Sequence, residues 1–271
     1  MIERSNGPLR AAGASVRRLL PTLLTCCAAL ALLLYGPIVQ PLHYHEFADT
    51  RALLGLPNAA DVLSNAGFAV VGAWGLVALW PARHHPALAA GWPGYVLFLI
   101  ALILTAAGSS YYHLAPDDAR LAVDRLPIAL ACAGLLAAVR AETRADASAA
   151  RWTVFLAAGA VASVGWWIFT NKLGQGDLRP YLLLQALPLL LIPLWQAAYH
   201  APKDDRIAFA TAIALYVLAK AAELSDHALF RALGSMSGHT LKHLAACVAA
   251  AVLVMQLRRR VRRDSGSHQA A

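Results

Sequence analysis

Two histidines near the start of the last apolar segment have the spacing at which one helix can present two imidazoles to a single ion. His239 and His243 are four residues apart, which is about one turn of an α-helix. Earlier in the chain, Ser109 and His113 have the same spacing, and Asp124 follows eleven residues after His113. Three protein ligands with one open position are typical of a catalytic zinc site. These residue types therefore predict a bound Zn²⁺ that activates water and polarises a carbonyl.

Each motif alone has a simpler explanation. A pair of histidines one turn apart fits equally well with imidazoles that are hydrogen-bonded inside a helix bundle, and the serine–histidine pair is a weaker signal still. The combination is more specific, because the expected topology brings all five side chains to the same end of their helices. Ionisable groups are costly inside a membrane and usually have a functional reason. We therefore favour the metal site.

The elements that must position these residues are membrane-spanning helices. The chain of 271 residues is 59% hydrophobic and only 14% charged, whereas soluble domains carry about 25% charged residues. Apolar runs of about 20 residues are long enough to cross a bilayer core, and helices satisfy their own backbone hydrogen bonds in lipid. We expect an all-α polytopic bundle with eight spans, at residues 19–39, 59–80, 94–113, 124–140, 152–170, 180–199, 207–225 and 239–257.

The distribution of charge predicts the orientation of these spans. The net charge is +8, and most basic residues fall near the termini and in the loops between the second and third, fourth and fifth, and sixth and seventh spans. The positive-inside rule then places both termini in the cytoplasm and the three histidines near the periplasmic face of a bacterial inner membrane. Because the charge lies beside spans, it indicates lipid headgroups as partners and not nucleic acid. The basic run at the end of the chain is Arg258, Arg259, Arg260, Arg262 and Arg263.

Three regions are expected along the chain. Residues 1–39 form an extra N-terminal transmembrane helix or signal anchor, and an uncleaved helix is favoured over a cleaved signal peptide. Residues 40–257 form the main helical domain, and residues 258–271 form a basic cytoplasmic tail. The four cysteines lie within apolar runs without CxxC spacing, so they are expected to act as small hydrophobic residues and not as a disulfide framework.

The series Ser109-x₃-His113, Asp124 and His239-x₃-His243 resembles the motif of the alkaline ceramidases. This family belongs to the CREST superfamily of seven-helix membrane hydrolases, which also includes the progestin and adiponectin receptors. The stretch from Asn58 to Asn65 is similar to the start of the first family helix. The resemblance covers about residues 44–257, and here it would leave one additional span at the N-terminus.

The resemblance implies a function and a role for each matched residue. It implies zinc held by His113, His239 and His243, with Asp124 orienting or deprotonating the water and Ser109 holding the metal shell or the oxyanion. The implied substrate is a ceramide-like lipid amide that enters from the bilayer and is cleaved to a fatty acid and an amine. The alkaline ceramidases also carry an acidic calcium site. The carboxylates in the corresponding region of this chain are Glu46, Asp49 and Asp61.

Other polar residues are candidates for contacts around the zinc or with the substrate. Lys220 and Glu223 are three residues apart, so they are expected to pair on one helix face, and a role in binding the substrate headgroup is the alternative. Asp226 and Tyr112 are further candidates for supporting the site.

Two other functional classes remain open from the sequence. One is a receptor or sensor in which the zinc is structural. The other is a transporter or proton channel that uses the histidines as a relay. Stoichiometric zinc separates the relay from the other two classes, and hydrolysis of a lipid amide separates the enzyme from the sensor.

Overall fold

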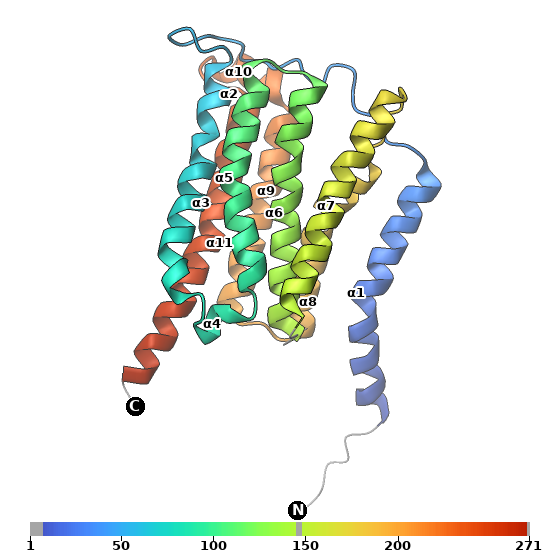
Figure 1. Cartoon of the computed structure of the whole chain (residues 1–271), viewed down its shortest axis with the longest axis vertical. Helices are drawn as coiled ribbons and strands as arrows, with labels where there is room; N and C mark the ends of the chain where they lie inside the picture. Colours follow the sequence, from blue (N-terminus) through green and yellow to red (C-terminus); the bar gives the residue numbers. More distant parts are fainter. Residues whose placement is uncertain (1–7, 145–147, 270–271) are drawn as a thin grey trace, which may run out of the picture.

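The computed structural model describes residues 8–144 and 148–269, and these segments are almost entirely helical (Figure 1). The helices run roughly parallel or antiparallel in one bundle, and the start of α1 lies at the same end as the last turns of α11. In chain order the elements are α1 Pro8–Tyr35, α2 Ala59–Ser64, α3 Ala66–Leu79, η1 Trp80–Ala82, α4 Pro86–Ala89, α5 Trp92–Leu114, α6 Asp118–Arg144, α7 Ala149–Lys172, α8 Arg179–Ala198, α9 Lys203–Leu224, α10 Asp226–Leu233 and α11 Gly238–Gln269.

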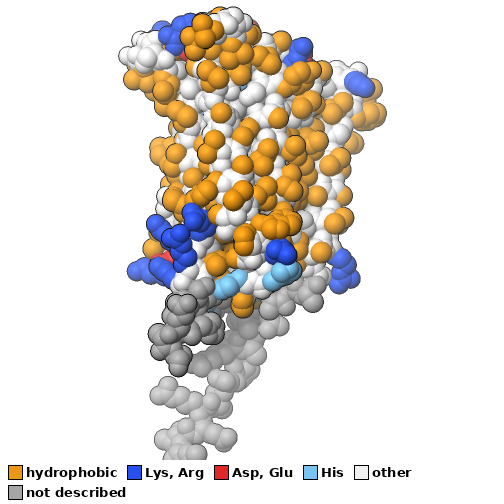
Figure 2. Space-filling view, turned by 60° about the vertical axis from the view of Figure 1, so that its left-hand side comes forward, with side chains coloured by type: hydrophobic (Ala, Val, Ile, Leu, Met, Phe, Trp, Pro, Cys, Tyr) orange, Lys and Arg blue, Asp and Glu red, His pale blue; other side chains and the backbone are white. Residues whose placement is uncertain are grey.

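Among the residues that the structure describes, seven segments are long and apolar enough to cross a membrane, which confirms the predicted polytopic fold. They are Ala59–Ala82, Trp92–Leu114, Asp118–Arg144, Ala149–Lys172, Arg179–Ala198, Lys203–Leu224 and Gly238–Arg263. Large apolar side chains also remain on the outside of the bundle, such as Val77, Val154 and Leu218. Figure 2 shows these side chains as a broad band between the two ends of the molecule. A surface of this kind is suited to lipid and not to water.

The predicted N-terminal span is shorter than expected. α1 ends at Tyr35 instead of residue 39, since Gly36 adopts a positive φ of 93°. Its described apolar part, Leu19–Tyr35, is shorter than the seven other spans, and 17 helical residues extend only about 25 Å. α1 packs against α8 and stands at the edge of the bundle (Figure 1). The seven-helix core is thus complete without it.

A buried carboxylate ties the chain after α1 to the loop between α7 and α8. Asp177 accepts hydrogen bonds from the Ile38 backbone N–H at 3.3 Å, from the Trp166 indole at 2.9 Å and from the Arg179 side chain. Burial acts to raise the pKa of Asp177, but the hydrogen bonds from Arg179, Trp166 and the two backbone N–H groups outweigh it and lower the pKa to about 2. The ionised form therefore stabilises this attachment.

This carboxylate predicts acid sensitivity of the folded chain. Because its folded pKa is depressed, the stabilisation is fully present above the unfolded pKa of about 4 and is lost as pH falls from about 4 towards 2. We expect the Tm in detergent to decrease over this window. The decrease should be smaller in an Asp177→Asn variant, which lacks the titrating group. An equal decrease in both proteins would assign the acid sensitivity to other carboxylates.

Glycines allow α5 and α6 to approach closely, and these two helices carry much of the predicted site. A Cβ atom on Gly108 would lie only 2.6 Å from the Val123 carbonyl oxygen and 3.5 Å from the Asp124 Cα. Gly94 and Gly134 make a similar contact near the other end of the pair. Small residues are typical of helix pairs that pack backbone to backbone in membranes. Gly108 therefore sets Ser109 beside Asp124.

The predicted start of the fourth span was wrong. Asp124 does not open its helix, because α6 begins at Asp118 and the connection from α5 is only residues 115–117. The Asp117 carboxylate accepts a hydrogen bond from the Arg120 backbone N–H at 2.7 Å, which satisfies an N–H group of the first helical turn. Asp124 consequently lies more than one turn inside α6.

The basic run after residue 257 is helical and continues the last span. α11 continues without a break from Gly238 to Gln269. Arg260 turns inward and pairs with Glu142 and Asp205, each at 2.8 Å. Asp205 also accepts a hydrogen bond from Gln256 at 2.7 Å. Arg260 therefore joins α11 to α6 and α9 instead of contacting lipid headgroups.

Candidate metal centre

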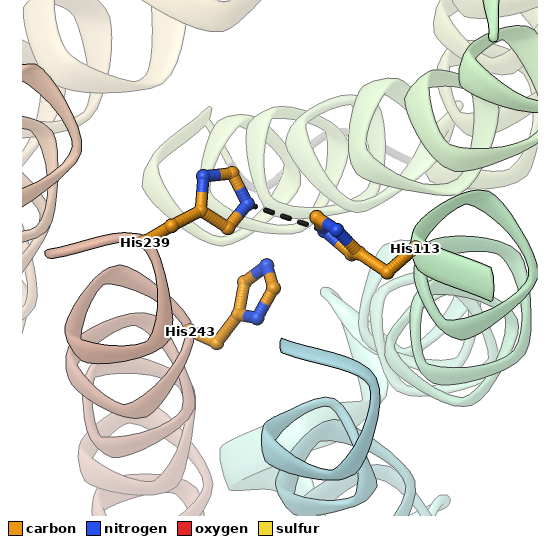
Figure 3. Close-up of side chains that lie close together, drawn as sticks. All are labelled: His113, His239 and His243. Carbon is orange, nitrogen blue, oxygen red and sulfur yellow. Dashed lines mark hydrogen bonds between the residues drawn. The ribbon is translucent and has the colours of Figure 1, made fainter. Parts of the chain in front are cut away.

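The three predicted histidines meet inside the bundle, where α5 contributes His113 and α11 contributes the other two (Figure 3). One ring nitrogen from each histidine lies within 4.8 Å of the others. All three side chains are buried, with exposed fractions of 1% for His113, 6% for His239 and 4% for His243. Three imidazoles pointing into one small volume form a group that could hold a metal ion.

The spacing and chemistry of these nitrogens fit zinc. The Nε2 atoms of His113 and His239 are 3.2 Å apart. Two ligands about 2.05 Å from a tetrahedral ion are separated by about 3.3 Å, given usual zinc–nitrogen distances of about 2.0–2.1 Å. All three ligand atoms lie within 4.8 Å of one another. Buried neutral imidazoles are good zinc ligands, so the donor set suits this ion.

Ser64 orients His243 for such a role. Its hydroxyl lies 2.8 Å from His243 Nδ1, which leaves Nε2 as the nitrogen facing the other two rings (Figure 3). Metal-bound histidines generally use their second ring nitrogen in this way. Ser64 is the last residue of α2, and the helix axis is interrupted at Asn65 before α3 begins.

We predict that Ser64→Ala weakens zinc binding about 10- to 100-fold, the usual effect of losing such a supporting hydrogen bond. Competition with a zinc chelator measures the change. Ser110→Ala is a matched control, because the Ser110 hydroxyl donates to the Val62 carbonyl oxygen instead of a histidine. Equal zinc affinity in the Ser64 variant and the control would contradict the assigned role.

Asp226, predicted as a supporting residue, fixes the start of α11. Its Oδ1 accepts a hydrogen bond from the His239 backbone N–H at 2.8 Å, and its Oδ2 accepts one from the Ala48 N–H at 2.9 Å. Gly238 lies directly against the Ala222 carbonyl oxygen, so a side chain there would push α11 away from α9. These contacts set the position of His239 through its backbone.

The segment before α2 covers the histidines with an aromatic ring. The Phe47 ring centroid lies 4.7 Å from that of His113 and 4.4 Å from that of His239. His45 holds this segment down, because its Nδ1 lies 2.9 Å from the Tyr112 hydroxyl and its Nε2 lies 3.0 Å from Asp118. Tyr112, a predicted supporting residue, thus anchors the cover over the histidines.

Asp124 and Ser109 face each other across the α5–α6 contact. The Ser109 side chain lies within interaction range of the Asp124 carboxylate, and Ser109 is 3% exposed. One carboxylate oxygen, Oδ1, is buried without a partner among the described residues. Asp124 therefore has a buried carboxylate oxygen that is free to accept a proton.

The three predicted calcium ligands do not come together. Glu46 pairs with His43 on the surface, Asp49 is held by the Arg51 side chain at 2.6 Å, and Asp61 accepts a hydrogen bond from the Thr240 hydroxyl at 2.6 Å. Asp61 is fully buried and supports the first turn of α11 instead. In the described part of the chain, only the three histidines form a group of three or more such side chains that could hold a metal.

The Lys220–Glu223 pair forms as the spacing predicted. Lys220 Nζ lies 2.5 Å from Glu223 Oε2. Lys242, which stands between the two histidines in sequence, also pairs with Glu223, at 3.0 Å. This places a cation of α11 inside the bundle, within electrostatic range of Asp124.

Some residues of the site had no assigned role in the sequence. Ser64 and Asn58 fall in the stretch that resembles a family helix, and the Asn58 amide donates to the His113 carbonyl oxygen at 2.7 Å. Phe47 carried no signal, since an aromatic residue in a loop is common.

The chain matches no known family profile, no curated protein and no solved structure.

Proposed function

We propose that this chain is a zinc-dependent membrane hydrolase that cleaves the amide bond of a lipid. The supporting observation is the buried triad of His113, His239 and His243, with ring nitrogens within 4.8 Å. A purely structural site usually closes its fourth position with a protein ligand, and here three residues converge. The resemblance of the motif to that of the alkaline ceramidases points to the same chemistry.

The residues around the triad have the properties that amide hydrolysis requires. Bound zinc would supply Lewis-acid chemistry, acidifying a water molecule and polarising the carbonyl. Asp124 would accept the proton of the attacking water through its free oxygen, and Ser109 beside it would keep the carboxylate oriented. Asp124 would then donate this proton to the leaving nitrogen as the carbon–nitrogen bond breaks, which yields a fatty acid and an amine.

The substrate would reach this site from the bilayer. Phe47 and the segment held by His45 cover the histidines from the loop-bearing end, so the acyl chain would enter between helices. We further propose that the protein resides in a bacterial inner membrane with both termini in the cytoplasm. On the face shown in Figure 2, Lys and Arg side chains lie at both ends and form the broader group at the lower end, opposite the loop that contains Phe47; such groups mark the cytoplasmic side.

The test combines metal analysis with turnover of a defined panel. The full chain, purified in detergent, is analysed for zinc and incubated with ceramides and simpler N-acyl amines. The proposal expects about one zinc per chain and release of fatty acid that a chelator abolishes. Zinc without hydrolysis across the panel would indicate a sensor with a structural ion. The absence of stoichiometric zinc would instead favour a histidine relay in a transporter or channel.

A further inference from the structure

Arg125 is a buried cation without a carboxylate partner, one residue from Asp124. Arg125 is only 3% exposed. Its Nη2 donates to the Gln40 side-chain oxygen at 2.8 Å, but Nε and Nη1 have no acceptor among the described residues. A guanidinium stays charged at every physiological pH and has five N–H donors. Burying it with most of those donors unused is unfavourable unless a further group completes them.

Three aromatic rings surround this guanidinium. Its Cζ atom lies 4.2 Å from the ring centroid of Trp167, 5.3 Å from that of Tyr44 and 5.5 Å from that of Tyr181. Such contacts stabilise the positive charge, but a ring face does not replace an acceptor in the plane of the N–H groups. The Trp167 indole N–H is also buried without an acceptor. Arg125 and Trp167 thus provide unused donors on adjacent side chains.

The other cations held inside the bundle are paired differently. Arg260 contacts Glu142 and Asp205, and Lys242 contacts Glu223. None of the ion pairs among the described residues includes Arg125. The fold therefore pairs these other interior cations with acidic side chains. Arg125, next to the proposed catalytic carboxylate, remains able to bind a group from outside the chain.

The position of Arg125 indicates which part of a lipid amide it would meet. It lies in the same turn of α6 as Asp124, and its charge acts on both Asp124 and Tyr112. Gln40, its partner, belongs to the segment that leads to the loop-bearing end of the bundle. Polar lipid groups collect at that end, whereas an acyl chain extends into the apolar band. A lipid amide bound at the histidines would therefore have its amine portion on the side of Arg125.

We propose that Arg125 and Trp167 bind an anionic group, a carboxylate or a phosphate, on the amine portion of the lipid amide. This inference rests on the proposed function. It specifies the substrate class as an N-acyl amine that carries a negative charge near the amide, such as an N-acyl amino acid, in preference to a neutral ceramide. Guanidinium groups bind carboxylate and phosphate through charge-assisted hydrogen bonds, and the anion would neutralise the buried charge.

Matched substrates test the specificity. The zinc-loaded full chain is assayed with N-dodecanoylglycine, N-dodecanoyl-phosphoethanolamine and the neutral N-dodecanoylethanolamine. We expect kcat/KM to be about 10- to 100-fold higher for at least one anionic substrate than for the neutral one, the size of effect typical of a hydrogen bond to a charged group. The anionic substrate with the higher kcat/KM identifies whether the bound anion is a carboxylate or a phosphate. The ratio of anionic to neutral kcat/KM should fall at least about tenfold in Arg125→Gln, and less in Arg125→Lys. Lys172→Gln, which changes an exposed cation at the same end, should keep the wild-type ratio.

A binding experiment separates this inference from the proposed hydrolysis. The same three amides are bound to zinc-loaded Asp124→Asn protein, which should not turn over, and Kd is measured with and without Arg125→Gln. If an anionic amide binds more tightly than the neutral amide, and Arg125→Gln removes this difference in Kd, the inference is supported even if no hydrolysis is found. Equal Kd values for the three amides, or an anionic preference that survives Arg125→Gln and Arg125→Lys, would overturn it. Free dodecanoate is the last probe. If Arg125→Gln raises the Kd of dodecanoate but not the Kd of any of the three amides, the guanidinium binds the carboxylate of the fatty acid and the proposal is wrong.

Discussion

Replacing His239 with alanine should remove bound zinc and with it all hydrolytic activity. Within residues 8–144 and 148–269, the candidate site consists of the three histidines, so the variant keeps two of these ligands. Zinc affinities correspond to apparent binding free energies of about 10–16 kcal/mol in four-ligand structural sites. Loss of one ligand should therefore weaken binding by on the order of 10²- to 10³-fold. His113→Ala and His243→Ala should have effects of the same size, measured as zinc per chain after dialysis against a weak chelator.

The control for this result is another histidine. His84 is exposed and lies in the connection between η1 and α4, far along the chain from the triad. His84→Ala should retain zinc and activity at the wild-type level. If His239→Ala also retains stoichiometric zinc, the triad is not the metal site and the three rings are hydrogen-bonded side chains of a helix bundle.

The second large effect is expected at Asp124. Asp124→Asn keeps the size and polarity of the side chain beside Ser109, but the amide cannot accept a proton. General acid–base catalysis contributes about 10²- to 10⁴-fold in enzymes, so kcat for the true substrate should fall by that factor. Zinc content should remain unchanged, because Asp124 is not one of the three grouped ligands.

Asp117→Asn provides the matched control on the same segment. Asp117 pairs with Arg120 at the start of α6, and its loss should weaken the first turn slightly without changing kcat. A wild-type rate in Asp124→Asn would show that this carboxylate does not transfer the proton. A rate that falls together with zinc content would instead make Asp124 a determinant of metal binding.

The sequence predicted the helix bundle well because its signals were local. Each span is a continuous apolar run, and the physical requirement that backbone hydrogen bonds be satisfied in lipid leaves the helix as the only option for such a run. The histidines were also found locally, because one helical turn separates His239 from His243. Helix ends were less certain. Asp124 falls inside α6, since the polar residues from Asp118 onward continue the helix beyond the apolar region.

Other parts of the site depend on contacts between distant segments, which leave no periodic signal. Arg260 looked like a headgroup anchor because it belongs to a basic run, yet acids from α6 and α9 turn it inward. The acidic residues before α2 and in its first turn resembled a calcium site by position only. In the fold, Asp49 pairs with Arg51, whereas Asp61 accepts a hydrogen bond from Thr240.

The sequence by itself determined that the chain is a helical membrane protein and pointed to the three histidines that meet inside it, because hydropathy and one-turn spacing are properties of neighbouring residues. Only the tertiary structure decided what surrounds them. Ser64 meets His243, Phe47 covers two histidines, and Arg125 lies among aromatic rings without an acid. Residues far apart in the chain are brought together by glycine-mediated helix packing and by the fold of residues 36–58, and no local pattern encodes such contacts.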